Sequence, residues 1–309
     1  MPSHETAALG LSLPLWSVLP FAGLILSIAL FPVFAPKFWA RHFGKVSLAF
    51  GLPVAAYFLG CAPRELLHAV LEYGSFIMLL AALFIVSGGI LLKGTIRATQ
   101  GINCAFLAVG AVMANVLGTT GLLIRPLLRA NTGRKRLSHV VIFFIFVVAN
   151  IGGSLTAIGD PPLFLGYLRG VPFFWPLLHI GPIWLFTCVI VIGIFYLVDR
   201  RAFALERIAA GGDGPIPETV PPATGEKVPF SLEGKVNILL LGGVIAAVFL
   251  PAPWRETAMI LAAAVSVWKT PAGVREENEF TYHPIKEVAI LFAGIFAAMI
   301  PALLILKAR

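Results

Sequence analysis

An apolar run that begins near His139 is interrupted between Ala149 and Pro162 by a dense group of polar and helix-breaking residues. The stretch reads Ala-Asn-Ile-Gly-Gly-Ser-Leu-Thr-Ala-Ile-Gly-Asp-Pro-Pro and holds three glycines, two prolines and one acid. A membrane interior has no water to satisfy freed backbone groups, so such a break is tolerated only where protein or a cavity surrounds it. A carboxylate at that depth is costly and by default functional. The stretch therefore predicts a binding site near the middle of a membrane.

The rest of the chain has the composition of an integral membrane protein. Of its 309 residues 59% are hydrophobic and 12% are charged, and the mean hydropathy is +0.92. Soluble domains carry about 25% charged residues. The net charge of +8 comes from Lys and Arg in short segments between apolar runs, which is the positive-inside pattern and not a nucleic-acid face. We expect a multi-pass protein of the cell membrane, the inner membrane of a bacterium, with the lipid bilayer as its partner and no nucleic acid.

Enzyme motifs are missing from the sequence. The three cysteines, Cys61, Cys104 and Cys188, form neither a CxxC pair nor a Cys/His ligand spacing. No phosphate-binding glycine loop, nucleophile elbow or zinc signature occurs. We therefore expect no enzyme, no catalytic residue, no cofactor, and no metal site apart from that of a transported ion.

Apolar runs divide the chain into candidate spans, each of which needs about 20 residues. These runs cover about 11–34, 46–62, 67–92, 102–130, 139–168, 177–198, 236–253, 257–268 and 286–306. Two linkers, 199–235 and 269–285, separate the later runs. The first is rich in Gly and Pro and is expected to be a flexible cytoplasmic loop.

The basic residues predict a re-entrant hairpin over about 102–130. Lys93 and Arg97 precede this run, and Arg134 to Arg136 follow it. The positive-inside rule places both groups in the cytoplasm, so the segment between them crosses an even number of times or does not cross fully. Two half-helices with a tip near 115–121, where polar residues and glycines cluster, satisfy this constraint. The run at about 139–168 then crosses outward as a broken helix.

The hairpin tip and the broken helix both combine an amide, hydroxyls and glycines at a helix interruption. Half-helix N-termini offer N–H groups to an anion, whereas half-helix C-termini and unwound carbonyls offer oxygen ligands to a small cation. The alternative is that these small polar residues only pack helices together. The candidate ion- or substrate-binding residues are Asn115, Thr119, Thr120, Asn150, Gly152, Gly153, Ser154, Thr156 and Asp160.

Two further charged residues are possible accessory groups. Glu72 lies four residues after His68 and shares its helix face; this spacing suits a metal or a proton relay, but an interfacial pair is the simpler explanation. Arg125 could attract a carboxylate substrate from the second arm of the hairpin, or extend its side chain to the cytoplasmic surface.

The stretch 150–162 resembles the broken-helix signature of the ion transporter superfamily, which includes NhaD-type sodium/proton antiporters, arsenite permeases and citrate or dicarboxylate carriers. The segments 121–131 and 287–301 also look like the branch of citrate transporters or sodium/proton antiporters. The resemblance implies an all-α, inverted-repeat, elevator-type transporter in which each repeat has a re-entrant hairpin and a broken helix. It also leaves room for a homodimer.

On this resemblance residues 1–198 form the first repeat, 199–235 the linker, and 236–309 the beginning of a second repeat. No second group of Asn/Gly/Thr breakers follows residue 236, so we expect a second repeat that is incomplete because the chain is truncated. The leading functional hypothesis is sodium:proton antiport, in which sodium and protons are the coupling ions. Symport of citrate or another carboxylate is the alternative, and a non-transporting membrane subunit or inactive fragment is a further one.

Overall fold

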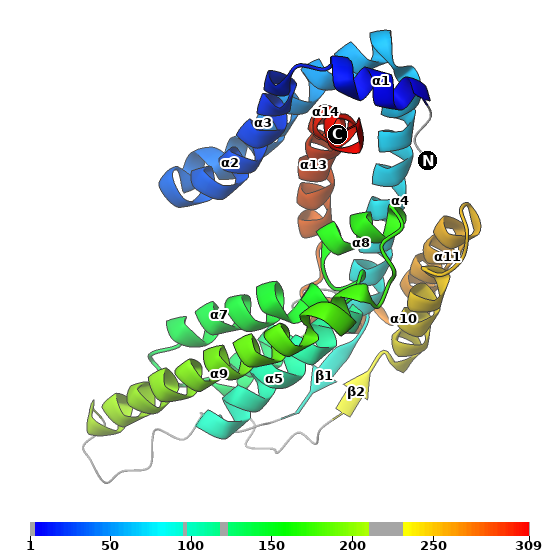
Figure 1. Cartoon of the computed structure of the whole chain (residues 1–309). Coiled ribbons are helices and arrows are strands. Elements are labelled where there is room, and N and C mark those ends of the chain that lie inside the picture. Colours follow the sequence, from blue (N-terminus) through cyan, green and yellow to red (C-terminus); the bar gives the residue numbers. More distant parts are fainter. Residues whose placement is uncertain (1–3, 95–97, 118–122, 210–230, 309) are drawn as a thin grey trace. The chain divides into compact units, whose positions relative to one another are not determined.

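The computed structural model describes residues 4–94, 98–117, 123–209 and 231–308, and nearly all of them lie in helices (Figure 1). The chain splits into two compact units. One contains Met1–Ile77 and Thr281–Arg309, and the other contains Met78–Phe280. The units are defined by contacts within the structure, and their bounds differ from those of the predicted repeats, 1–198 and 236–309. The repeats describe the expected topology and stay a prediction.

The first unit is built from apolar helices packed through small residues. Its elements are α1 (His4–Ser12), η1 (Leu15–Val18), α2 (Leu19–Phe34), α3 (Pro36–Cys61), the first part of α4 (Pro63–Ser87), α13 (His283–Ala298) and α14 (Ile300–Ala308). Gly51 of α3 lies against Gly294 of α13. Beside them the Ser47 hydroxyl donates to the carbonyl oxygen of Ile290 at 2.9 Å. Small residues of this kind let two membrane helices approach closely and bond across their interface.

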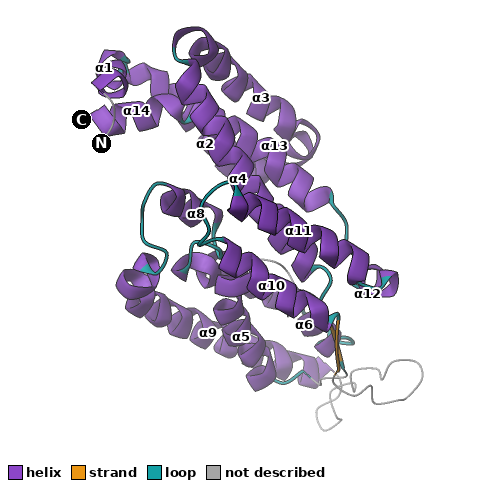
Figure 2. Cartoon of the chain, turned by 90° about the vertical axis from the view of Figure 1, so that its right-hand side faces the viewer, coloured by secondary structure: helices purple, strands orange, loops and turns teal. Residues whose placement is uncertain are grey.

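The second unit contains the interrupted helix and a short pair of strands. After α4 come β1 (Leu91–Lys93), α5 (Gln100–Leu117), α6 (Ile124–Ala130), α7 (Ser138–Phe144), η3 (Ile145–Ile151), η4 (Gly152–Leu155), α8 (Pro161–Leu168), α9 (Trp175–Ala209), β2 (Ser231–Glu233), α10 (Lys235–Ala247), α11 (Trp254–Lys269) and α12 (Ala272–Glu277). β1 and β2 pair antiparallel, with Leu91 opposite Glu233 (Figure 2). The all-α expectation is thus confirmed except for this two-stranded sheet.

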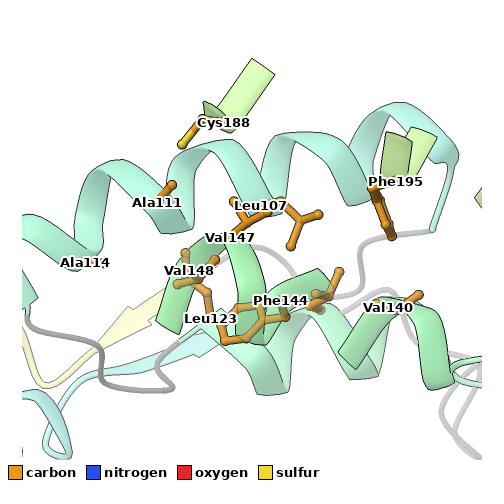
Figure 3. Packing of buried hydrophobic residues seen from close by; sticks show 11 residues of the cluster. Leu107, Ala111, Ala114, Leu123, Val140, Phe144, Val147, Val148, Cys188 and Phe195 are labelled. Atoms are coloured by element: carbon orange, nitrogen blue, oxygen red, sulfur yellow. The ribbon is translucent and has the colours of Figure 1, made fainter. Parts of the chain in front are cut away.

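One hydrophobic cluster joins α5, α6 with the preceding Leu123, α7–η3 and α9. Figure 3 shows Leu107 and Ala111 of α5 beside Val147 and Val148 of η3, with Cys188 of α9 next to them. Gly110 permits this approach, since a methyl group there would contact the side chain of Val148 at 2.7 Å. The cluster fixes the interrupted helix against α5.

Among the described residues five helices are long and apolar enough to cross a membrane, at Leu15–Phe34, Pro36–Cys61, Pro63–Ser87, Ser138–Leu155 and Trp175–Ile208. A sixth span results if α13 and α14, bent by 41°, are counted together. The expectation of a multi-pass membrane protein is therefore supported, and the chain is a helical membrane protein.

Several predicted boundaries differ from the structure. The helix expected at 46–62 begins at Pro36, because a proline at the first helical position fits the helix and the basic residues that follow do not break it. α9 continues through the predicted start of the linker to Ala209, and β2 occupies 231–233; residues 210–230 lie outside the described residues. The run expected at 102–130 forms two helices of unequal length, α5 and α6.

Candidate functional site

The helix interruption predicted at 149–162 is present. α7 passes into a π-helix (η3) and then a 3-10 turn (η4) that ends at Leu155. Thr156 is extended, with φ −134° and ψ 155°, and α8 starts only at Pro161. The helix therefore has a real C-terminal end at Leu155, and such an end leaves carbonyl groups without partners inside the helix.

Glycines are required here because backbone segments touch. A methyl group on Gly153 would collide with the carbonyl group of Gly159, and one on Gly159 would collide with that of Gly153. A methyl group on Gly152 would lie 3.0 Å from the Cα atom of Ala111 on α5. Gly152 and Gly153 thus shape the interruption and its contact with α5; a direct role in binding stays a prediction.

Asn115, at the end of α5, is bonded to the interruption from a buried position. Its side-chain Oδ1 accepts a hydrogen bond from the backbone N–H of Leu155 at 2.9 Å. Its own carbonyl oxygen accepts a hydrogen bond from the Thr156 hydroxyl. Its Nδ2 donates to the carbonyl oxygen of Ala111 at 3.1 Å. Asn115, the described member of the hairpin-tip candidates, therefore meets the broken-helix candidates at this point.

The remaining hydroxyl and amide groups of the interruption are bonded locally. The Thr156 hydroxyl accepts a hydrogen bond from the backbone N–H of Gly159 at 3.2 Å. The Ser154 hydroxyl donates to the carbonyl oxygen of Ile151 at 2.9 Å, and Trp184 of α9 donates to the same oxygen at 2.8 Å. Asn150 is exposed and donates to Ile145, five residues earlier, which is the spacing of a π-helix.

Asp160 is half-buried and directly precedes α8. Within the described part of the chain its carboxylate has no hydrogen-bond or ion-pair partner, and it does not cap the helix. Two prolines follow and lack N–H groups, while the N–H of Leu163 bonds to the backbone oxygen of Asp160 at 3.0 Å. The start of α8 is consequently poor in free donors for an anion, and the carboxylate favours a cation.

The structure also locates the other candidates. Thr119 and Thr120 lie outside the described residues. Arg125 of α6 forms an ion pair of 3.2 Å with Glu279, so its described partner is a carboxylate of the chain itself. Glu72 lies in α4, half-buried, and has a polar interaction of its own. A role for either residue in transport stays a prediction.

The two arms of the predicted hairpin are bonded where they begin and end. Asn103, near the start of α5, and Asn131, just after α6, exchange side-chain hydrogen bonds of 3.1 and 2.8 Å. Asn131 also ends α6 by donating to the carbonyl oxygen of Leu127 at 2.8 Å. The chain thus returns to the start of α5, as a hairpin requires; its re-entrant placement in a membrane stays a prediction.

A buried charged cluster next to these asparagines was not predicted. Asp199 of α9 is fully buried and forms an ion pair of 2.9 Å with Arg134. His139 Nε2 lies 2.8 Å from its Oδ1, and Asn103 donates to its Oδ2 at 3.0 Å. The sequence places Asp199 at the start of a linker because it ends an apolar run; the helical pattern that continues through Phe203 indicates a longer α9 but not the burial of Asp199.

A second buried polar group joins the end of α4 to α10, α11 and α12. Asn237 donates to the carbonyl oxygen of Gly89 and to the Thr270 hydroxyl, both at 2.8 Å. Its Oδ1 accepts from the Ser266 hydroxyl at 2.6 Å, and Arg275 donates to that hydroxyl oxygen at 2.9 Å. The part of the predicted linker up to Phe280 is therefore packed within the second unit, where Arg275 contacts Ser266, and is not merely a connection.

A cavity of about 720 Å³ lies between α5, α10 and the two strands. Its lining is apolar and includes Phe106, Val109 and Met113 of α5 with Ile238 and Leu241 of α10. Such a lining suits hydrocarbon and offers no donor for a polycarboxylate. The interruption, with its amide, hydroxyl and carboxylate groups, is the better candidate for a polar substrate or ion.

Comparison with known families gives one match that covers nearly the whole chain. A family model described as "Putative citrate transport" matches residues 10–309. Searches of the curated proteins and of the solved structures found no match.

Proposed function

The chain belongs to the citrate transport family whose model it matches, and we propose on this premise that it is a secondary transporter of citrate or a related carboxylate, coupled to a cation. The description of the family is one of transport. The cation is bound at the interruption between η4 and α8, with sodium as the first candidate. In a bacterial cell the protein would reside in the inner membrane.

One observation carries the proposal: a carboxylate with no partner among the described residues follows a helix C-terminus that ends inside the protein. Asp160 has no described partner and follows Leu155 by five residues. The C-terminal end of a helix carries a partial negative charge. Backbone carbonyls, hydroxyls and a carboxylate are the ligands that hard cations prefer. These groups support cation binding by the interruption.

A bound cation would also compensate the negative charge of a carboxylate substrate. Citrate is an anion, yet the start of α8 has two prolines in place of N–H donors. A cation held by Asp160 and the adjacent carbonyls would supply positive charge where the substrate binds. Cation and carboxylate would then bind together, which favours symport over independent binding.

Sodium:proton antiport is the second candidate, because Asp160 alone could bind a sodium ion or a proton in turn. Its distinguishing property is sodium-driven proton movement in the absence of a carboxylate. Under the symport proposal this movement is absent, and uptake of citrate requires the cation gradient.

The test is uptake by proteoliposomes that contain the full chain. Labelled citrate should accumulate when an inward sodium gradient is imposed and should not when potassium replaces sodium. Asp160→Asn should abolish the sodium dependence, whereas Glu287→Gln, which removes a partly exposed charge on α13, should not. Sodium-driven proton movement without citrate uptake would instead establish the antiporter. Absence of both activities would refute transport by this chain.

A further inference from the structure

The cluster around Asp199 joins four segments that are far apart in the sequence. We define it as Asn103, Asn131, Arg134, His139, Asp199 and Glu206. They come from α5, the segment after α6, α7 and α9. Asp199 lies on α9 and contacts the three other segments through Asn103, Arg134 and His139. Its carboxylate is therefore the common acceptor of the group.

Arg134 extends the cluster to a second carboxylate. Its side chain is 2% exposed, and its Nε lies 3.1 Å from Glu206 Oε2. Its guanidinium lies over the ring of Phe203 at 3.7 Å and also donates to Asn131 Oδ1 at 2.9 Å. A buried guanidinium needs such partners, because an uncompensated buried charge is strongly destabilising. Asp199, Glu206 and Asn131 supply these partners to Nη1 and Nε, while Nη2 is buried with no hydrogen-bond partner among the described residues.

α5 is hydrogen-bonded at both ends. Asn103 near its start is bonded to Asp199, and Asn115 near its end is bonded to Leu155. These asparagines are separated by about 18 Å along the helix axis. The helix that begins with α7 is likewise bonded at both ends, through His139 to Asp199 and through Leu155 to Asn115.

The bonds close a ring that runs from Asp199 to Asn103, along α5 to Asn115, across to Leu155, and back along η4, η3 and α7 to His139. Hydrophobic packing fills the space between the two helices. Ala111 and Leu107 lie against Val147 and Val148 there (Figure 3). In such a ring a shift of one helix along the other is opposed at both ends.

We propose that Asp199 is a positioning residue that sets the register of α5 against the interrupted helix, and thereby the contact between Asn115 and Leu155 at the candidate site. Asp199 acts through α5 and α7 and does not touch the substrate. Its role in transport rests on the proposed function, whereas its role in register does not. Loss of its charge frees His139 and Asn103, so the helices can shift and the Leu155 N–H loses its acceptor.

Hydrogen–deuterium exchange of the purified full chain tests the register. Asp199→Asn should accelerate amide exchange in segment 98–104, next to the cluster, and also in segment 150–158 by about threefold or more. Asn103→Ala, which leaves the ion pair between Asp199 and Arg134 in place, should produce a smaller change in both segments. The Asn103 variant replaces Asp199→Asn in this experiment if Asp199→Asn does not fold.

Asn237→Ala is the matched control, because Asn237 is an equally buried asparagine near the start of another helix of the same unit. It should accelerate exchange around α10 and leave segment 150–158 unchanged. The inference is overturned if the Asp199 or Asn103 variant accelerates exchange at 98–104 without any change at 150–158, or if neither segment responds.

Citrate uptake distinguishes a change in helix register from a loss of folded protein. Asp199→Asn should raise the KM for citrate by about threefold or more per folded molecule, because the site geometry changes. Glu233→Gln, which removes a partly exposed charge on β2, should not. A lower maximal rate with an unchanged KM would refute action on the site. If the wild-type chain takes up no citrate the proposed function fails, and the exchange experiment still decides the register.

Discussion

Asn115 accepts a hydrogen bond from the backbone N–H of Leu155, forty residues later in the chain, at a distance of 2.9 Å. The backbone oxygen of Asn115 also accepts a hydrogen bond from the Thr156 hydroxyl. One buried asparagine at the end of α5 therefore satisfies both the last residue of the interrupted helix and the first residue beyond it. The geometry of the break depends on this side chain.

Replacement of Asn115 should destabilise the protein. Asn115→Ala leaves the buried N–H of Leu155 without its acceptor, and an unsatisfied buried donor costs about 1–3 kcal/mol. Thermal unfolding in detergent should show a lower midpoint. Asn150→Ala is the matched control, because Asn150 is exposed and, among the described residues, bonds only within its own helix; it should shift stability by under about 0.5 kcal/mol. Equal effects of the two variants would contradict the assigned role.

The contact between Gly153 and Gly159 should tolerate no side chain. Gly153→Ala places a methyl group against the carbonyl group of Gly159, so the backbone must move, at a cost of about 1–3 kcal/mol. Gly242→Ala in α10 meets no atom within 4 Å and should stabilise its helix by about 0.5–1 kcal/mol. The comparison requires three unfolding curves, those of the wild type and of the two variants. A neutral Gly153→Ala would show that the backbone contact is not needed.

The interruption could be predicted from the sequence because its causes are local. Three glycines and two adjacent prolines lie close together at 152–162 and disfavour a continuous helix, and Asn115 is an amide among apolar residues. That a hairpin and a broken helix belong to one repeat is implied by the resemblance to the ion transporter superfamily. What could not be predicted was the bonding pattern, such as the choice of the Leu155 N–H as donor.

The burial of Asp199 could not be predicted, because it depends on contacts among segments far apart in the sequence. Asp199 precedes two exposed arginines, Arg200 and Arg201, and an acid in such a charge run is typical of a membrane edge. The strand pair was missed for a similar reason. Leu91–Lys93 and Ser231–Glu233 are three residues each, too short to show an alternating pattern, and they become strands only by pairing with each other.

The junction of the strands with α12 should weaken at alkaline pH. Lys93 forms ion pairs with Glu277 at 2.8 Å and Glu233 at 3.0 Å. The hydrogen bond to Glu277, and next that to Glu233, raise the pKa of Lys93 above its ordinary value of 10.5. A raised pKa means that the stabilisation is fully present below pH 10.5 and is lost as pH rises through the folded-state value.

Amide exchange of β1, β2 and α12 should therefore accelerate above this pH in the wild type beyond the intrinsic effect of base. Lys93→Arg should remain protected, because an arginine keeps its charge there. Lys93→Met should show faster exchange already at neutral pH. If wild type and Lys93→Arg respond alike to alkaline pH, the ion pairs with Lys93 do not hold this junction.

Sodium should stabilise the wild-type chain through Asp160 even without substrate. A ligand that binds only the folded state adds about 2.7 kcal/mol at one hundred times its dissociation constant, so the unfolding midpoint in detergent should rise with sodium chloride at constant ionic strength. Potassium chloride or choline chloride should have a smaller effect.

Asp160→Asn removes the carboxylate that has no described partner, so it should abolish the sodium-specific rise while leaving the ion-independent midpoint close to that of the wild type. Glu287→Gln should keep the rise. A sodium response that persists in Asp160→Asn would place the cation elsewhere and remove the carboxylate from the proposed coupling site.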